Sequence, residues 1–175
     1  VLDVCCGTGT IGLCVAGAAR RVLGLELVQA AVQDALSNAR RNGVRNAMYA
    51  AGRAEDTLTR LVSESGLPMM TTEGTEPVVV RLAEGERCVA LVDPPRSGLH
   101  PSVLRALRQC KLVSHVVYVS CNPTGSFVQD AMGLCSPADG RKHRGPPFKA
   151  TRAAPVDLFP FTEHCELVAC FERLS

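Results

Sequence analysis

The chain has 175 residues, of which 46% are hydrophobic, and this length and composition suit one domain with one sizeable core. Its formal net charge of +2 is too small to indicate nucleic-acid binding by itself, so that argument depends on where the charges lie. Charges interrupt every apolar run before it reaches the roughly 20 residues of a membrane span, and this excludes a protein anchored by such a span.

The first residues, Val1-Leu2-Asp3-Val4, have the pattern of a strand that is already under way. No initiator Met, signal peptide or amphipathic targeting helix stands ahead of them. We therefore expect the chain to be a fragment that lacks its true N-terminus.

The nine cysteines lie mostly inside apolar runs, and no two of them form the C-x-x-C pair that zinc sites use. Their spacing therefore argues against both a metal site and the disulfide framework of a secreted miniprotein. We expect most of them to be buried free thiols in a reducing intracellular compartment, the cytosol or the nucleus rather than the mitochondrion.

The first third of the chain alternates strands and helices at the spacing of βαβ units. Apolar periodicity predicts strands at Val1–Cys5, Arg21–Leu27 and Met48–Ala51, and helices at Ile11–Ala19 and Gln29–Asn42. This alternation predicts an α/β fold with an open, mostly parallel sheet and helices on both faces.

The remainder begins with a stretch, residues 63–87, that mixes Gly, Pro, Thr and Glu and is predicted to be an irregular, exposed insertion. Residues 137–152 are rich in Pro, Gly and basic side chains, and the two strands after them are predicted to be antiparallel. The elements predicted here are strands at 88–92, 115–120, 154–158 and 166–173 and a helix at 102–109.

A glycine-rich turn, Gly7-Thr8-Gly9-Thr10-Ile11-Gly12, joins the first strand to the first helix and fits G-x-G-x-x-G. Its glycines let the backbone approach a ligand, and the helix N-terminus favours negative charge. Glu26, about 20 residues on, can bind a ribose. The turn alone fits a dinucleotide, S-adenosylmethionine or no ligand at all.

Two acidic positions favour S-adenosylmethionine. Asp3 lies inside the first strand, where methyltransferases of this fold often carry an acid and a nicotinamide site has no need of one. The acids of Arg53-Ala54-Glu55-Asp56 follow the third strand and can accept a hydrogen bond from an adenine amino group. An acid that stabilises a helix N-terminus explains the second position equally well.

Asp93-Pro94-Pro95-Arg96 directly follows a buried strand, at the sheet edge where open α/β sheets bind ligands. Asp93 can accept a hydrogen bond from a cofactor or a base, and Arg96 can bind phosphate. The plain alternative is a proline turn with a solvated arginine.

A cysteine and a glutamate near two later strands are candidates for chemistry. Cys121, flanked by polar Ser120 and Asn122, is an exposed strand-end thiol and a candidate nucleophile, and the Asn122 amide can orient a base or cofactor. Glu166 begins the last strand and can act as a base, whereas Glu163 is a solvated loop charge. A packed structural cysteine and a surface carboxylate are the alternatives.

The chain resembles the RNA 5-methyluridine methyltransferases, the TrmA and RumA family, and within it the eukaryotic tRNA (uracil-5-)-methyltransferase homologues. The resemblance spans nearly the whole chain, and its three most specific segments stand last in the list. The segments that carry it are LDVCCGTGTIGL, GLELVQAAVQDA, GRAED, LVDPPRSGLHP, YVSCNP and VDLFPFTEHCE.

The resemblance implies that residues 1–175 form a Rossmann-like class I S-adenosylmethionine-dependent methyltransferase domain acting on uridine in tRNA. It implies that Cys121 is the nucleophile, that Glu166 is the proton acceptor and that the target uridine is flipped out of its stack. The implied cofactor contacts are Cys5, Gly7, Gly9, Thr10, Glu26 and Asp93.

Basic residues between the two catalytic motifs are consistent with phosphate contacts, although they also suit a solvated basic loop. The residues that we expect to contact RNA are Arg96, Asn122, Arg141, Lys142, Arg144 and Lys149. Family members carry further chain upstream, including RNA-binding parts, and some bind an iron–sulfur cluster there. We expect no cluster in this chain and a monomeric protein.

Three other functions remain open. An RNA 5-methylcytosine methyltransferase shares the cofactor and the covalent addition, although its cysteine motifs differ from S-C-N-P. A non-catalytic RNA-binding or RNA-folding module keeps the same fold. A nicotinamide oxidoreductase is the weakest alternative because it explains neither S-C-N-P nor H-C-E.

Overall fold

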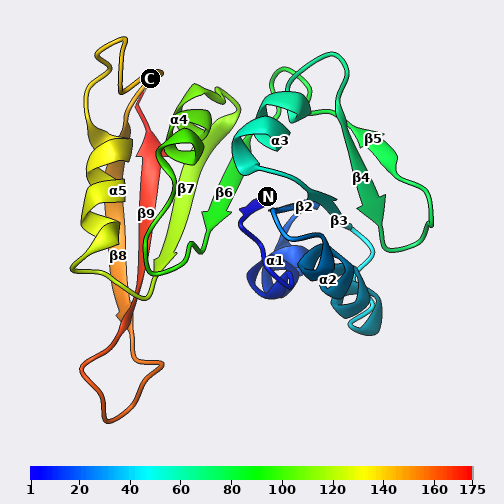
Figure 1. Cartoon of the computed structure of the whole chain (residues 1–175), viewed down its shortest axis with the longest axis horizontal. Coiled ribbons are helices and arrows are strands. Elements are labelled where there is room, and N and C mark those ends of the chain that lie inside the picture. The colour runs from blue at the N-terminus through cyan, green and yellow to red at the C-terminus, as the bar shows by residue number, and fades with distance from the viewer. Residues whose placement is uncertain (175) are drawn as a thin grey trace.

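A nine-stranded sheet runs across the computed structural model, which describes residues 1–174 (Figure 1). Its strand order is β5-β4-β3-β2-β1-β6-β7-β9-β8. The strands are β1 (Leu2–Val4), β2 (Val22–Glu26), β3 (Ala47–Ala51), β4 (Leu67–Thr71), β5 (Val78–Val80), β6 (Cys88–Val92), β7 (Val113–Ser120), β8 (Phe148–Val156) and β9 (Glu166–Arg173). The helices are α1 (Thr10–Val15), the 3-10 turn η1 (Ala16–Ala18), α2 (Gln29–Arg41), α3 (Ala54–Leu61), α4 (Pro101–Gln109) and α5 (Ser126–Cys135).

The five central strands, β3-β2-β1-β6-β7, are all parallel. The chain leaves β1 in one direction to form β2 and β3, and later returns to the other side of β1 to form β6 and β7. Ligands of open α/β sheets bind at this kind of switch point, outside the carboxyl ends of the strands. β9 is antiparallel to both β7 and β8, as the sequence predicts for the last two strands.

The helices cover both faces of the sheet, and each face has its own apolar core. The α2 residues Val32, Ala35 and Leu36 pack in one buried cluster, whereas Leu58 of α3 and Leu107 of α4 belong to the other. In Figure 1, α1 and α2 lie together on one side of the parallel strands and α3 and α4 on the other. The predicted α/β class, with a mostly parallel sheet and helices on both faces, is confirmed.

The prediction that residues 63–87 are irregular is wrong for the two strands within them, although more than half of these residues are exposed as expected. This stretch forms β4 and β5, a hairpin that extends the sheet beyond β3. Leu67, Met69 and Val80 are buried, with 3%, 0% and 5% exposure. Isolated apolar residues among Gly, Pro and Glu give no clear period, so these strands arise from the pairing of β4 with β3 and of β5 with β4 rather than from a local pattern.

Three other elements differ from the sequence prediction. α3 and α5 were not predicted as helices, and β8 begins at Phe148 rather than at residue 154. Every residue of β8 after Phe148 is exposed, so the strand carries no apolar alternation that marks it in the sequence. Its backbone pairing with β9 defines it instead.

All nine cysteines are free, but only Cys6, Cys88 and Cys110 are buried, while Cys14 is exposed. The prediction that most of them are buried is therefore wrong, since several strand and loop cysteines reach partly to the surface. None of the helices described over residues 1–174 has the length and apolar character that crossing a bilayer requires.

Candidate active site

The last parallel strand and the last antiparallel strand bring the two predicted catalytic residues to one edge of the sheet. β7 ends at Ser120, and β9 runs the opposite way from Glu166, with Ser120 paired to Leu167. Cys121 follows Ser120 and Glu166 precedes Leu167, so each lies one step beyond this pair at the same end. Neighbouring strands lie about 4.8 Å apart, which sets the scale of their separation.

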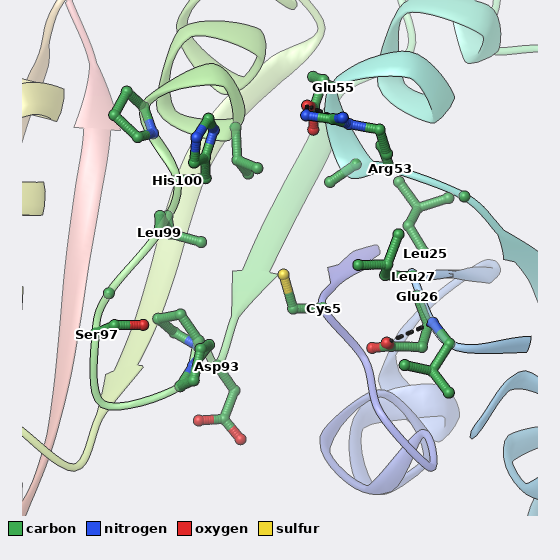
Figure 2. A pocket seen from close by; sticks show the side chains of 18 residues that line it. Cys5, Leu25, Glu26, Leu27, Arg53, Glu55, Asp93, Ser97, Leu99 and His100 are labelled. Atoms are coloured by element: carbon green, nitrogen blue, oxygen red, sulfur yellow. Dashed lines mark hydrogen bonds and ion pairs between the residues drawn. The ribbon is translucent and has the colours of Figure 1, made fainter. Parts of the chain in front are cut away.

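A cavity of about 850 Å³ lies at this edge, beyond the ends of β1, β2, β3 and β6. Three residues of the predicted cofactor set, Cys5, Glu26 and Asp93, line it. Figure 2 shows Cys5 between Asp93 on one side and Glu26 on the other, with Glu55 and His100 farther along the cavity. A volume of this size accommodates a nucleoside-sized ligand.

Glu26 holds the chain around the glycine turn. One carboxylate oxygen accepts a hydrogen bond from the Gly7 amide at 2.9 Å, and the other accepts from the Val28 amide at 2.9 Å. Cys5 and Gly7 have positive φ angles of 62° and 53°, and a Cβ on Gly7 would meet nothing within 4 Å. The open space at Gly7 is what a close approach of ligand to backbone requires.

Gly9 and Thr10 stand at the start of α1, and like Gly7 they are not among the residues that line the cavity. A Cβ on Gly9 would lie 2.9 Å from the buried Tyr49 hydroxyl oxygen, and Gly9 has a φ of 81°. Gly9 is therefore required by packing and by backbone conformation, a requirement that the motif alone does not reveal. Thr10 is exposed, and its hydroxyl lies 3.3 Å from that of Thr8.

Asp3 supports the glycine turn from within β1. Its side chain is 2% exposed, and one oxygen accepts a hydrogen bond from the Gly12 amide at 3.0 Å. Burial raises the pKa of Asp3 from 3.8 to about 6, against the effect of that hydrogen bond and with smaller contributions from the charges of Asp93 and Glu26. Asp3 thus holds a helix N-terminal amide in place, a role distinct from direct ligand contact.

Asp3→Asn is expected to change how stability depends on pH. Because the folded state binds the Asp3 proton more tightly, this contribution is fully present below pH 3.8 and is lost as pH rises through about 6. The unfolding free energy of the original protein should fall by about 3 kcal/mol relative to the variant between pH 3 and pH 7. Urea unfolding of both proteins across this range measures the difference, and parallel pH curves would contradict it.

Glu166 is a buried carboxylate in a site that also contains Asp93 and Arg96. It is 9% exposed, and its Oε2 atom has no hydrogen-bond partner among residues 1–174. Burial raises the pKa of Glu166, the charge of Asp93 raises it further, and Arg96 acts in the opposite direction. A carboxylate with a raised pKa is a stronger base, and an unpaired oxygen is free to accept a proton.

Asn122 joins the S-C-N-P loop to the D-P-P-R loop. Its side-chain amide donates a hydrogen bond to the Arg96 carbonyl oxygen at 3.1 Å, and its backbone amide donates to the Ser120 hydroxyl at 3.1 Å. Cys121 between them is half-buried. The two loops that were singled out separately in the sequence are therefore in direct contact.

The predicted RNA-contacting residues Arg141, Lys142, Arg144 and Lys149 are exposed and lie outside the cavity. The first three belong to the connection between α5 and β8, and Lys149 is near the start of β8. The buried guanidinium of Arg108 donates to the Arg144 carbonyl oxygen at 3.3 Å and so ties this connection to α4. Their contact with RNA remains a prediction.

A polar group at the far end of the cavity could not be assembled from the sequence. Glu55 accepts hydrogen bonds from Arg53 at 2.9 Å and from the Ser102 hydroxyl at 3.0 Å, and His100 Nδ1 lies 2.6 Å from the same hydroxyl. Glu55 and Ser102 are 47 positions apart and meet only because α3 packs against α4. Of the two acids proposed for an adenine contact, Glu55 lines the cavity and Asp56 does not.

No cluster of three or more His, Cys, Asp or Glu side chains suited to a metal ion occurs within residues 1–174.

The chain is similar to the human tRNA (uracil-5-)-methyltransferase homolog A, with 45% identity over 178 residues that cover 100% of this chain and 25% of the relative. It is 44% identical to the mouse tRNA (uracil-5-)-methyltransferase homolog B, over 99% of this chain and 32% of the relative. It therefore spans about a quarter to a third of the length of these relatives.

Solved structures show the same fold. The Pyrococcus abyssi tRNA (uracil-54, C5)-methyltransferase in complex with S-adenosyl-L-homocysteine has a TM-score of 0.64 at 28% identity, over 97% of this chain and 33% of that one. An rRNA methylase from Streptococcus thermophilus has a TM-score of 0.62 at 10% identity, over 99% of this chain and 86% of that one, which shows the fold alone. The fold is the Rossmann-like class I methyltransferase fold.

The family model described as tRNA (Uracil-5-)-methyltransferase matches residues 1–173, which include every segment that carried the resemblance in the sequence. Together with the paired strand ends at Cys121 and Glu166, this match shows that the chain belongs to the tRNA (uracil-5-)-methyltransferase family.

Proposed function

We propose that the chain is the catalytic part of an enzyme that transfers a methyl group from S-adenosylmethionine to carbon 5 of uridine in tRNA. The single observation that carries this proposal is the register of β7 and β9, which sets Cys121 and Glu166 at one strand end. A thiol and a carboxylate with a raised pKa are the two groups that methylation at this carbon needs.

The residues of the cavity suit S-adenosylmethionine. Glu26 would bind the ribose hydroxyls, for which its oxygens retain lone pairs beyond the two backbone bonds. Gly7 leaves open space in which a ligand can approach the backbone. Asp93 and Cys5 line the same cavity as Glu26. When bound, S-adenosylmethionine supplies a sulfonium methyl group that an activated carbon 5 accepts, and it leaves as S-adenosylhomocysteine.

Cys121 activates the uracil ring, whose carbon 5 is otherwise a poor nucleophile. The thiol gives its proton to solvent, and the thiolate sulfur forms a bond to carbon 6. The electron pair of the 5,6 double bond moves into an enolate at carbon 4, which makes carbon 5 nucleophilic. The base must leave its stack for the sulfur to reach its face.

Glu166 completes the reaction as the base. After methylation, carbon 5 carries both the new methyl group and its original hydrogen. The Glu166 carboxylate accepts that proton, the electron pair of the broken C–H bond restores the double bond, and the bond between carbon 6 and sulfur breaks. The unpaired Oε2 atom of Glu166 is suited to this step.

The exposed cations near β8 would bind the phosphates of the RNA. Arg141, Lys142, Arg144 and Lys149 provide this charge in a chain whose formal net charge is only +2. Arg96 and Asn122 lie beside the proposed catalytic pair and would contact the target nucleotide. A monomeric protein that meets tRNA in the cytosol or nucleus is the form in which we expect it to act.

Nucleoside analysis of methylated RNA tests the proposal. The natural gene product, with its flanking sequence, is incubated with unmodified tRNA and methyl-labelled S-adenosylmethionine, and the digested nucleosides are separated by mass. The expected product is 5-methyluridine. Label in 5-methylcytidine would favour the cytosine-modifying alternative, and cofactor binding without label in RNA would favour a non-catalytic RNA-binding module.

Glu26→Gln is expected to weaken S-adenosylhomocysteine binding by about 10-fold or more. The amide keeps one acceptor oxygen but presents an NH2 group to a backbone N–H, so one of the two bonds that shape the turn is lost. Titration calorimetry measures the affinity. Glu76→Gln, the same change at an exposed position, should bind as the original does, and equal affinities in all three proteins would contradict the role of Glu26.

A further inference from the structure

Asp130 of α5 connects β7 to the loop that follows β6. Its Oδ2 atom accepts a hydrogen bond from the Tyr118 hydroxyl at 2.6 Å and from the Leu99 backbone amide at 2.7 Å. Asp130 is 5% exposed. Tyr118 lies on β7, three residues before Cys121, which directly follows that strand, and Leu99 lines the cavity. One buried oxygen thus connects the cavity wall to the strand that carries the proposed nucleophile.

Ser126, one turn earlier on α5, makes a second connection between the same parts. Its hydroxyl donates to the Arg96 carbonyl oxygen at 2.9 Å, the same oxygen that accepts from the Asn122 amide. The contacts of Asp130 and Ser126 thus hold the two ends of the segment from Arg96 to Leu99. A helix that touches one loop at two points, four residues apart on one face, fixes its orientation as well as its distance.

Gly98 permits this close approach. It has a φ of 82°, and a Cβ there would lie 2.7 Å from Asp130 Oδ2 and 2.9 Å from the Ser126 Cβ atom. Any side chain at this position would push α5 away from the loop. The segment can therefore lie directly against α5 because residue 98 is glycine.

Burying a carboxylate is unfavourable in free energy compared with burying an apolar side chain. No ion pair within residues 1–174 involves Asp130, so its charge is balanced by hydrogen bonds alone. An apolar residue of similar size would avoid the cost of removing a polar group from water. The observed residue is better explained by the geometry that its two hydrogen bonds impose.

We propose that Asp130 and Ser126 are positioning residues that hold the segment from Arg96 to Leu99, and with it this part of the cavity wall, in register with Cys121. This inference rests on the proposed function and extends it to α5, none of whose residues line the cavity. The methyl donor and the nucleophile act on adjacent carbons of one ring, so their relative placement controls the rate. A misplacement of about 1 Å can cost about 100-fold in rate.

The experiment compares Asp130→Ala, Asp130→Asn and Ser126→Ala in the natural gene product, with Asp34→Ala on the exposed face of α2 as the matched control. Single-turnover methyl transfer is measured with RNA and cofactor both saturating, at a temperature where each variant is folded. Backbone hydrogen exchange over residues 96–100 is measured on the same proteins without RNA. Asparagine keeps an acceptor oxygen, whereas alanine does not.

Asp130→Ala should lower the single-turnover rate by about 10 to 100-fold and speed exchange at the Leu99 amide. Ser126→Ala should have a smaller effect in the same direction, and Asp130→Asn and Asp34→Ala should stay within about 3-fold of the original. A folded Asp130→Ala protein with the original rate and the original exchange would overturn the inference, as would a rate that Asp130→Asn does not restore.

The exchange measurement keeps this inference separable from the proposed function. If the original protein transfers no methyl group while Leu99 protection still depends on Asp130, the proposed function fails and the contact stands. If methylation is present and Asp130 affects only the melting temperature, the positioning role fails and the function stands.

Discussion

Cys121→Ala is expected to abolish methyl transfer, with a loss of about 10⁴-fold or more, because the alanine methyl group cannot add to carbon 6. The sharpest measurement uses tRNA in which the target uridine carries fluorine at carbon 5. Fluorine cannot leave as a proton, so the reaction stops with the protein bonded to the RNA. The original protein should give a band of protein joined to RNA in denaturing electrophoresis, and Cys121→Ala should give none.

Cys14→Ala is the matched control, since Cys14 is an exposed thiol on α1 that no part of the mechanism uses. This variant should form the covalent band as the original does. A band that persists in Cys121→Ala but disappears when another cysteine is replaced would assign the nucleophile elsewhere. No band in the original protein, despite measured cofactor binding, would count against covalent catalysis as a whole.

Glu166→Gln is expected to stall the reaction after methyl transfer and to slow turnover by about 10² to 10⁴-fold. Glutamine cannot accept the carbon 5 proton, so Cys121 stays bonded to a methylated, saturated ring. Unlike the original protein, this variant should accumulate the covalent complex with natural, unfluorinated tRNA. Electrophoresis with labelled S-adenosylmethionine should show the methyl group in the joined band.

Glu163→Gln provides the comparison for this prediction, because Glu163 is exposed in the loop that leads into β9, three residues before Glu166. It should turn over normally and leave no joined band. If Glu166→Gln released free methylated RNA at the original rate, another base would have to remove the proton.

The positive charge of Arg96 lowers the pKa of Glu166, against the effect of burial. Removing that charge should raise the pKa of Glu166 further, so the pH profile of methyl transfer should shift to higher pH.

The parallel part of the fold was predictable because each of its strands is short, apolar and followed by a loop of distinctive chemistry. Asp93 and Cys121 were recognised as strand-end residues, and the structure has them directly after β6 and β7. Glu26 was recognised from its distance to the glycine turn, and its hydrogen bond to Gly7 explains that distance. The local sequence pattern and the expected strand order were enough to predict where these residues lie.

The parts that escaped prediction depend on contacts between residues far apart in the chain. α5 carries a glycine and three polar side chains in a short apolar run, and its role is visible only where Asp130 meets Leu99, 31 positions earlier. β8 is exposed along almost its whole length and owes its conformation to β9. Burial of Glu166 likewise follows from the assembled sheet, since in sequence it is an ordinary loop-edge acid.

The antiparallel pairing of β9 with β7 also determines which sequence changes this family architecture can accept. Because side chains alternate between the two faces of a strand, a one-residue insertion or deletion within β9 would turn the Glu166 carboxylate to the opposite face. The connection from Asp157 to Cys165 joins β8 to β9, lies outside the paired residues and is exposed for most of its length. A change of length in this connection should therefore leave the face of Glu166 unaltered, whereas β9 must keep a fixed count of residues.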